Sequence, residues 1–139
     1  MINSFPHIKY IVLLLMVSTL FSCSKENGTN PFPLPHGEVE VSFEKDVQPI
    51  FDQNCISCHP SSGSLSLKSG SSYDNLVNVV SPEYGVVRVS PFYKDSSVIC
   101  MKLHGFEGYG FLMPLNGIPL EPEEIKTIED WIDQGAINN

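Results

Sequence analysis

Residues 55–59, Cys-Ile-Ser-Cys-His, constrain this chain more than any other part of its sequence. Two thiols lie about one helical turn apart, and an imidazole follows the second thiol directly. With this spacing each thiol can add to a vinyl group of a haem, and the histidine can place a ring nitrogen on the iron. We therefore expect Cys55 and Cys58 to attach one c-type haem covalently, with His59 as the proximal iron ligand.

Two other kinds of site use a Cys-x-x-Cys pair. A redox-active dithiol would suit a thioredoxin-like fold, but the strand-helix-strand pattern which that fold needs is absent from the sequence. A zinc site needs further ligands, and the remaining candidates, Cys100, His104 and His36, are not spaced as a second binding pair. The pattern therefore favours haem over both alternatives.

The beginning of the chain predicts export. Residues 1–22 hold Lys9 and then an apolar run from Tyr10 to Phe21, which is typical of a signal peptide and too short to span a bilayer comfortably. Leu20-Phe21-Ser22 directly precedes Cys23 and resembles the lipobox of bacterial lipoproteins, in which the cysteine is acylated and becomes the new N-terminus. We therefore expect a protein of the bacterial cell envelope, lipid-anchored through Cys23 at the periplasmic face or the outer membrane.

Composition divides the rest of the chain into a tether and one domain. Residues 23–40 carry the acylated cysteine and a flexible tether rich in Pro, Gly and polar residues, and residues 41–139 form a single domain. Without residues 1–22 the chain has seven basic and sixteen acidic residues, a net charge of −9. Such a charge argues against nucleic acid as a partner and favours a redox partner protein with a basic docking surface, although a merely solvated surface would look the same.

Apolar spacing predicts a helix at each end of the domain. We expect the first to run from Asp46, as its cap, to Ser57, with Pro49 in its first turn. The last begins at Pro122 and ends at Gly135. The apolar faces of these two helices comprise Val47, Ile50, Phe51 and Asn54, and Ile125, Ile128, Trp131 and Ile132.

The part of the domain between these helices is rich in loops. A short helix is expected at residues 73–80, and another at residues 98–103, where Gly105 stops it. The expected core contacts of the middle part are Leu65, Leu67, Leu76, Val79 and Val80.

A haem iron held by one histidine has a second axial position to fill. Met113 is the expected distal ligand, because it lies on a glycine-rich loop that can pass closely over a flat cofactor and precedes Pro114, which favours an extended conformation. His104 is the alternative, although its place at a helix end also suits capping. Met101 and Cys100 lie in a short apolar helix, where core packing is the simpler interpretation.

Several stretches beyond the motif match a known pattern. They are Phe43–Phe51 leading into residues 55–59, Gly-x-Leu-x-Leu at residues 63–67, Ser96–Ile99, Met113-Pro114, and Glu123–Ala136 with its Trp-Ile-x-x-Gly-Ala ending. Over about Phe43 to Ala136 the chain resembles the small monohaem cytochrome c domain of bacterial envelope proteins, including those of Planctomycetes and Bacteroidetes.

The resemblance implies an all-α cytochrome c fold, in which crossed N- and C-terminal helices and several loops wrap one haem. It assigns thioether attachment to Cys55 and Cys58, the proximal ligand to His59 and the distal ligand to Met113. The chain departs from the pattern at Glu121, where Ser or Thr commonly caps the last helix.

Single-electron transfer by a membrane-tethered cytochrome is therefore the expected function. The sequence contains no recognisable general base, nucleophile or substrate pocket, so we do not expect an enzyme. One alternative is a haem enzyme or gas sensor with a labile distal ligand, which would bind carbon monoxide readily when reduced. Another is an interaction module with a purely structural haem, which fast reversible electron exchange would contradict.

Overall fold

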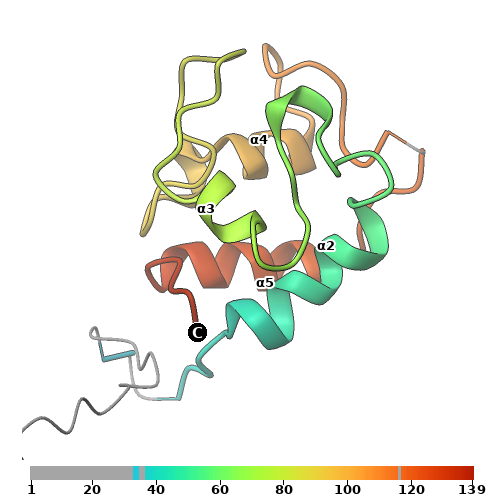
Figure 1. The fold of residues 1–139 in the computed structure, drawn as a ribbon. Helices are drawn as coiled ribbons and strands as arrows, with labels where there is room; N and C mark the ends of the chain where they lie inside the picture. Colours follow the sequence, from blue (N-terminus) through green and yellow to red (C-terminus); the bar gives the residue numbers. More distant parts are fainter. Residues whose placement is uncertain (1–32, 35–36, 116) are drawn as a thin grey trace, which may run out of the picture.

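The computed structural model describes residues 33–34, 37–115 and 117–139. The expected signal peptide, residues 1–22, the expected acylation site Cys23 and most of the expected tether lie outside this described part. The helical elements are η1 (Phe43–Val47), α2 (Gln48–Asn54), η2 (Ser62–Ser64), α3 (Ser72–Leu76), η3 (Lys94–Ser96), α4 (Val98–His104) and α5 (Pro122–Asp133) (Figure 1).

The described residues form no strand, and their β-type pairing consists of the isolated bridges Val77–Val89 and Val80–Val87. Helices account for about 40% of this part of the chain. The described residues are therefore helical and rich in loops, and the cytochrome c fold itself stays a prediction. No helix among them is long and apolar enough to cross a membrane.

The first helical segment begins earlier than expected and has a different cap. The Ser42 hydroxyl accepts a hydrogen bond from the backbone N–H of Lys45 at 3.3 Å, and the Ser42 N–H donates to Asp46 Oδ2 at 2.8 Å. The prediction that Asp46 is the cap is wrong, because this reciprocal pair satisfies free N–H groups one turn earlier. Pro49 lies in the first turn of α2 as expected, and α2 ends at Asn54, before the predicted end at Ser57.

The last helix begins and ends as expected. Pro122 is its first residue, and Gly135 follows its end with φ +104°, a conformation that glycine adopts without strain. Although Glu121 replaces the usual Ser or Thr, the N-terminus is still capped, because Glu124 Oε2 accepts from the Glu121 N–H at 3.0 Å.

The two terminal helices pack against each other through an aromatic cluster. The ring centre of Phe43, on η1, lies 5.0 Å from that of Trp131 on α5 and 5.3 Å from that of Tyr73 on α3. In Figure 1, α2 runs obliquely across α5. The predicted apolar faces are confirmed as core: the buried members are Val47, Ile50, Phe51, Ile128, Trp131 and Ile132.

The beginning and the end of the domain are also joined by hydrogen bonds. Gln134 accepts from the Val41 N–H at 2.8 Å and donates to the Val39 carbonyl at 3.0 Å. Asn139 Oδ1 accepts from the Phe43 N–H at 2.8 Å. We call this set of contacts the terminal clasp, and it holds residues 39–43 against the C-terminal end of α5.

The middle of the domain differs from expectation at one end of a helix. α3 is shorter than the predicted helix 73–80, because Val77 is extended, with ψ 124°, and forms the bridge with Val89. Asn78 follows with a left-handed φ of +59°. Leu67 and Leu76 are buried as expected, but Val80 is 55% exposed, so its prediction as a core residue is wrong. α4 and its left-handed Gly105 cap agree with the sequence.

Candidate functional site

The Cys-x-x-Cys-His motif begins where α2 ends. The Cys55 N–H donates to the Phe51 carbonyl at 2.9 Å and so closes the last turn of the helix. Asn54 Nδ2 donates to the Ile50 carbonyl at 3.2 Å and to Glu124 Oε1 on α5 at 3.1 Å. The motif is therefore fixed at the point where α2 meets the first turn of α5.

The motif continues the helical direction for one further turn. The Cys58 N–H and the His59 N–H both donate to the Cys55 carbonyl, at 3.1 Å and 2.8 Å. Cys55 is half-buried, Cys58 is exposed, and both thiols are free. The structure thus presents two thiols and an imidazole on one turn, as the predicted attachment chemistry requires.

A backbone carbonyl selects the tautomer of His59. Nδ1 lies 3.1 Å from the carbonyl oxygen of Ser62, and because a carbonyl only accepts, Nδ1 must carry the hydrogen. In the neutral ring the lone pair is then on Nε2, the nitrogen that can bind a metal. Histidine ligands in proteins are commonly oriented by such a hydrogen bond from the other ring nitrogen.

The segment after the motif folds back against α2. The Leu67 N–H donates to the His59 carbonyl at 2.8 Å, and Gln48 Nε2 donates to the Leu67 carbonyl at 3.0 Å. Ser72 also donates to the buried Gln48 side chain. These contacts fix the backbone of His59 as well as its ring.

The two candidates for the distal ligand occupy different surroundings. Met113 is half-buried, its N–H donates to the Lys102 carbonyl at 3.0 Å, and the Met113–Pro114 peptide bond is cis. His104 places Nε2 2.7 Å from Glu129 Oε1, and its ring stacks on Phe106 with centres 5.8 Å apart. The structure therefore already gives the imidazole of His104 a partner on α5, which favours Met113.

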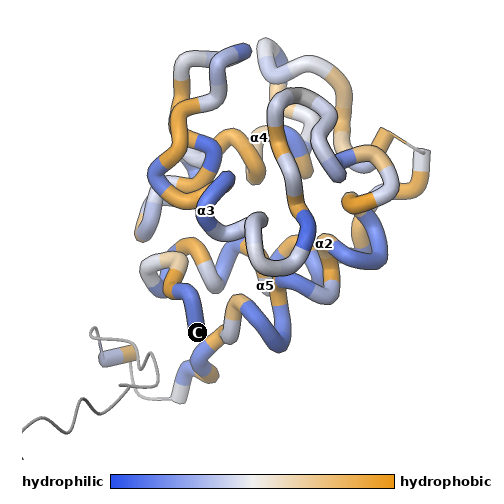
Figure 2. Tube along the Cα trace, in the orientation of Figure 1, coloured by the Kyte–Doolittle hydropathy of each residue, from blue (hydrophilic) through white to orange (hydrophobic). Residues whose placement is uncertain are grey.

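The loop that carries Met113, residues 105–119, exposes large apolar side chains. Five of them are between 42% and 77% exposed: Phe106, Phe111, Leu112, Leu115 and Ile118. Figure 2 shows apolar positions along this loop, whereas the outer side of α2 is hydrophilic. The loop leads into the first turn of α5, where Asn54 holds the motif. A flat apolar cofactor at this end of α5 would give these side chains a surface to cover.

Arg88 is a buried cation without a carboxylate partner among the described residues. Its side chain is 7% exposed and donates to the Asn75 carbonyl at 2.9 Å and to the Ser64 carbonyl at 3.1 Å. A buried charge is costly unless an opposite charge compensates it. Ser64 lies in the segment that follows His59, and a haem would bring two propionate groups whose negative charge a cation such as Arg88 could compensate.

Burial shifts the titration of two cysteines in the same direction. The pKa of Cys55 is raised to about 11, mainly by burial and further by the charge of Glu124. The pKa of Cys100 is raised to about 12, again mainly by burial, and its side chain is 4% exposed. Reactive Cys-x-x-Cys dithiols have lowered pKa values, so Cys55 does not have the surroundings of an oxidoreductase thiol.

No zinc-like cluster accompanies the motif. Among the described residues, no three side chains of His, Cys, Asp or Glu gather so that they could hold a metal ion. Zinc sites in proteins need three or four such ligands, whereas a haem iron takes at most two from the protein.

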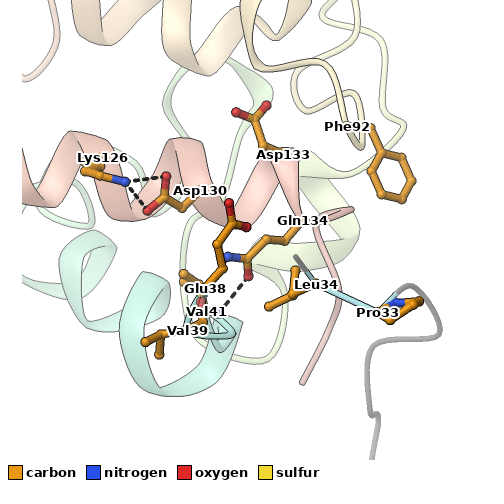
Figure 3. Close-up of a pocket in the computed structure, with 10 residues that line it drawn as sticks. All are labelled: Pro33, Leu34, Glu38, Val39, Val41, Phe92, Lys126, Asp130, Asp133 and Gln134. Atoms are coloured by element: carbon orange, nitrogen blue, oxygen red, sulfur yellow. Dashed lines mark hydrogen bonds and ion pairs between the residues drawn. The ribbon is translucent and has the colours of Figure 1, made fainter. Parts of the chain in front are cut away.

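A pocket in the structure lies away from the motif. On one side it is lined by Pro33, Leu34, Glu38, Val39 and Val41, and on the other by Lys126 and Asp130 of α5 and by Gln134, which directly follows the helix (Figure 3). The described residues that line it include no cysteine, histidine or methionine. The pocket therefore shares no residue with the candidate site at residues 55–59 and Met113.

Sequence reasoning missed Arg88 and the partner of Asn54. Arg88 is the only arginine in the sequence, beside seven lysines. Because arginine is favoured over lysine where a buried cation makes several hydrogen bonds, this single arginine could have indicated such a position. Asn54 interrupts an otherwise apolar face, which could have indicated a long-range hydrogen bond. Nothing in the sequence pointed to the Ser62 carbonyl.

Comparison with protein-family models, with curated proteins and with solved structures finds no match for this chain. The functional assignment therefore depends on the residues and geometry described above.

Proposed function

We propose that this protein is a lipid-anchored cytochrome of the bacterial envelope, which holds one c-type haem through Cys55 and Cys58 and transfers single electrons. The observation that carries the proposal is the turn at residues 55–59. It combines two free thiols with an imidazole whose Nδ1 is bound to the Ser62 carbonyl.

Each residue of the site has a defined part in this function. The haem supplies a one-electron iron couple. Cys55 and Cys58 would retain the cofactor by thioether bonds, and His59 would bind the iron through Nε2, the nitrogen left free by the contact of Nδ1 with Ser62. Met113 is the proposed distal ligand, and a thioether in that position favours the reduced state. The apolar side chains of residues 105–119, which are exposed in this structure, would exclude water from the bound haem.

The rival interpretations have less support. The raised pKa of Cys55 argues against a reactive dithiol, and the described residues offer no further ligands for zinc. A gas sensor or peroxidase would need an open distal position, and carbon monoxide binding by the reduced protein distinguishes it from a carrier with Met113 as ligand. The electron carrier is thus the function that these observations support best.

Charge and the N-terminal sequence extend the proposal to partners and location. The acidic net charge favours an electron-transfer partner with a basic surface and disfavours nucleic acid. Acylation of Cys23 would keep the domain at the periplasmic face or the outer membrane.

Haem staining after denaturing electrophoresis tests covalent attachment directly. The wild-type protein should give a stained band, and the variant C55S/C58S should give none, because both thioether bonds are lost. Cys100→Ser is the matched control, since it removes a thiol outside the motif and should keep the band. A band of normal intensity in C55S/C58S contradicts the proposal. Spectra in both redox states and carbon monoxide binding by the reduced protein distinguish a carrier from a gas binder.

A further inference from the structure

A polar cluster outside the motif joins α4 to the loop of residues 105–119. Lys102 Nζ donates to the Tyr109 carbonyl at 2.7 Å and to the Tyr84 hydroxyl oxygen at 3.2 Å. The Tyr84 hydroxyl donates to the same Tyr109 carbonyl at 3.0 Å. The Lys102 ammonium also lies 5.5 Å from the centre of the Tyr84 ring. Side chains from Tyr84 and from Lys102 of α4 therefore meet the 105–119 loop at one carbonyl oxygen, that of Tyr109.

The backbone of Lys102 extends this cluster to Met113. The Lys102 carbonyl accepts from the Met113 N–H at 3.0 Å. One residue of α4 thus fixes the loop at two points, through its side chain at Tyr109 and through its backbone at Met113. We call Lys102 and Tyr84 the loop clamp.

Gly110 allows the loop to approach the clamp closely. A Cβ atom at this position would lie 3.2 Å from the Tyr84 hydroxyl oxygen and 3.3 Å from Lys102 Nζ, and the φ of Gly110 is +73°. Both features favour glycine. The close contact is therefore built into the sequence between Tyr109 and Met113.

The loop needs such a restraint because packing supplies little. Its five large apolar side chains, from Phe106 to Ile118, are exposed. Segments with few buried apolar contacts open locally at low cost in free energy. Charge-assisted hydrogen bonds are stronger than neutral ones, so the Lys102 ammonium restrains this loop more strongly than a neutral donor would.

We infer that Lys102 and Tyr84 are positioning residues, which hold the 105–119 loop so that Met113 stays on the iron. The inference rests on the proposed function, in which Met113 is the distal ligand. Neither clamp residue binds the iron. Their effect is to keep the ligating conformation of the loop populated, and thereby to keep the distal position closed to other ligands.

The variant Lys102→Met removes the ammonium while it keeps the length of the side chain. We expect a weaker sulfur-to-iron band in the oxidised spectrum and carbon monoxide binding to the reduced protein that is about tenfold faster, as the loss of one charge-assisted hydrogen bond allows. Amide hydrogen exchange at Met113 should also accelerate. Tyr84→Phe, which removes only the hydroxyl, should change the same quantities less, and Lys102→Arg should restore part of the band.

Lys126→Met is the matched control. It removes the same charge from an exposed position on α5, where Lys126 pairs with Asp130, and it leaves the loop contacts intact. Wild-type band intensity and carbon monoxide rates in both Lys102→Met and Tyr84→Phe would overturn the inference, as would equal effects of Lys126→Met and Lys102→Met. If Lys102→Met does not fold, Tyr84→Phe gives the answer.

Haem staining separates this inference from the proposed function. Absence of a covalent haem band in the wild-type protein refutes the proposed function and the inference with it. The inference alone is refuted if the wild-type protein stains for haem and Met113→Ala removes the sulfur-to-iron band, while the clamp variants leave that band unchanged.

Discussion

The assignment of the distal ligand gives the sharpest test of the site, because Met113 and His104 differ in surroundings that the structure defines. In Met113→Ala the thioether is lost, so the sulfur-to-iron band should disappear, the reduction potential should fall and the reduced iron should bind carbon monoxide. His104→Ala should leave all three properties nearly unchanged. Spectra, potentiometry and ligand binding on the two purified variants provide the comparison.

The effect of His104→Ala on stability can be worked out from its contacts. The side chain is 41% exposed and loses its contact between Nε2 and Glu129 Oε1, and even a charged pair at such an exposed position contributes only about 0.2–1 kcal/mol. The free energy of unfolding should therefore fall by less than about 1 kcal/mol, which denaturant titration measures. A wild-type spectrum with two histidine ligands, disturbed by His104→Ala and not by Met113→Ala, would refute the reasoning.

Three further predictions concern separate parts of the chain. Cys23→Ser should release the protein from membranes with an unchanged haem spectrum; if the variant stays bound, the apolar run of residues 10–21 is an uncleaved anchor. Arg88→Met should lower the reduction potential more than Lys126→Met, because it removes a buried rather than an exposed positive charge, and equal potentials would contradict this. Because burial raises the pKa of Cys100 from 9.0 to about 12, the unfolded chain ionises first, so stability should fall between about pH 9 and 12. Denaturant titrations at several pH values should show a smaller fall in Cys100→Ala, and an identical fall would rule out this thiol as a cause.

Local pattern was sufficient for the buried faces of the terminal helices, but not for the ends of the first one. Val47, Ile50 and Phe51 on one side and Ile128, Trp131 and Ile132 on the other follow helical spacing, and all are buried in the structure. The end of α5 was also predictable, because Gly135 takes a conformation that other residues avoid. Such features depend on residues within one or two turns of each other.

Features that depend on distant segments could not be predicted in the same way. The apolar run from Leu76 to Val80 is compatible with a helix or with extended chain. The bridge between Val77 and the distant Val89 makes the chain extended after Leu76. The hydrogen-bond partners of Arg88 lie 13 and 24 residues away in the sequence. Those of Lys102 lie 7 and 18 residues away. Side-chain hydrogen bonds to backbone carbonyls carry no sequence signal at the accepting residue, because every residue has a carbonyl.

The terminal clasp determines how far the domain could travel from a membrane. Gln134 holds Val39 and Val41 at the C-terminal end of α5, whereas Asn54 holds the motif at the other end of this helix, which is about 18 Å long. With the proposed anchor at Cys23, the sixteen steps of chain from Cys23 to Val39 allow a reach of at most about 58 Å. The tether would leave the domain on the side away from the motif. The proposed redox centre would then face away from the membrane and could meet partner proteins anywhere within that distance of the anchor.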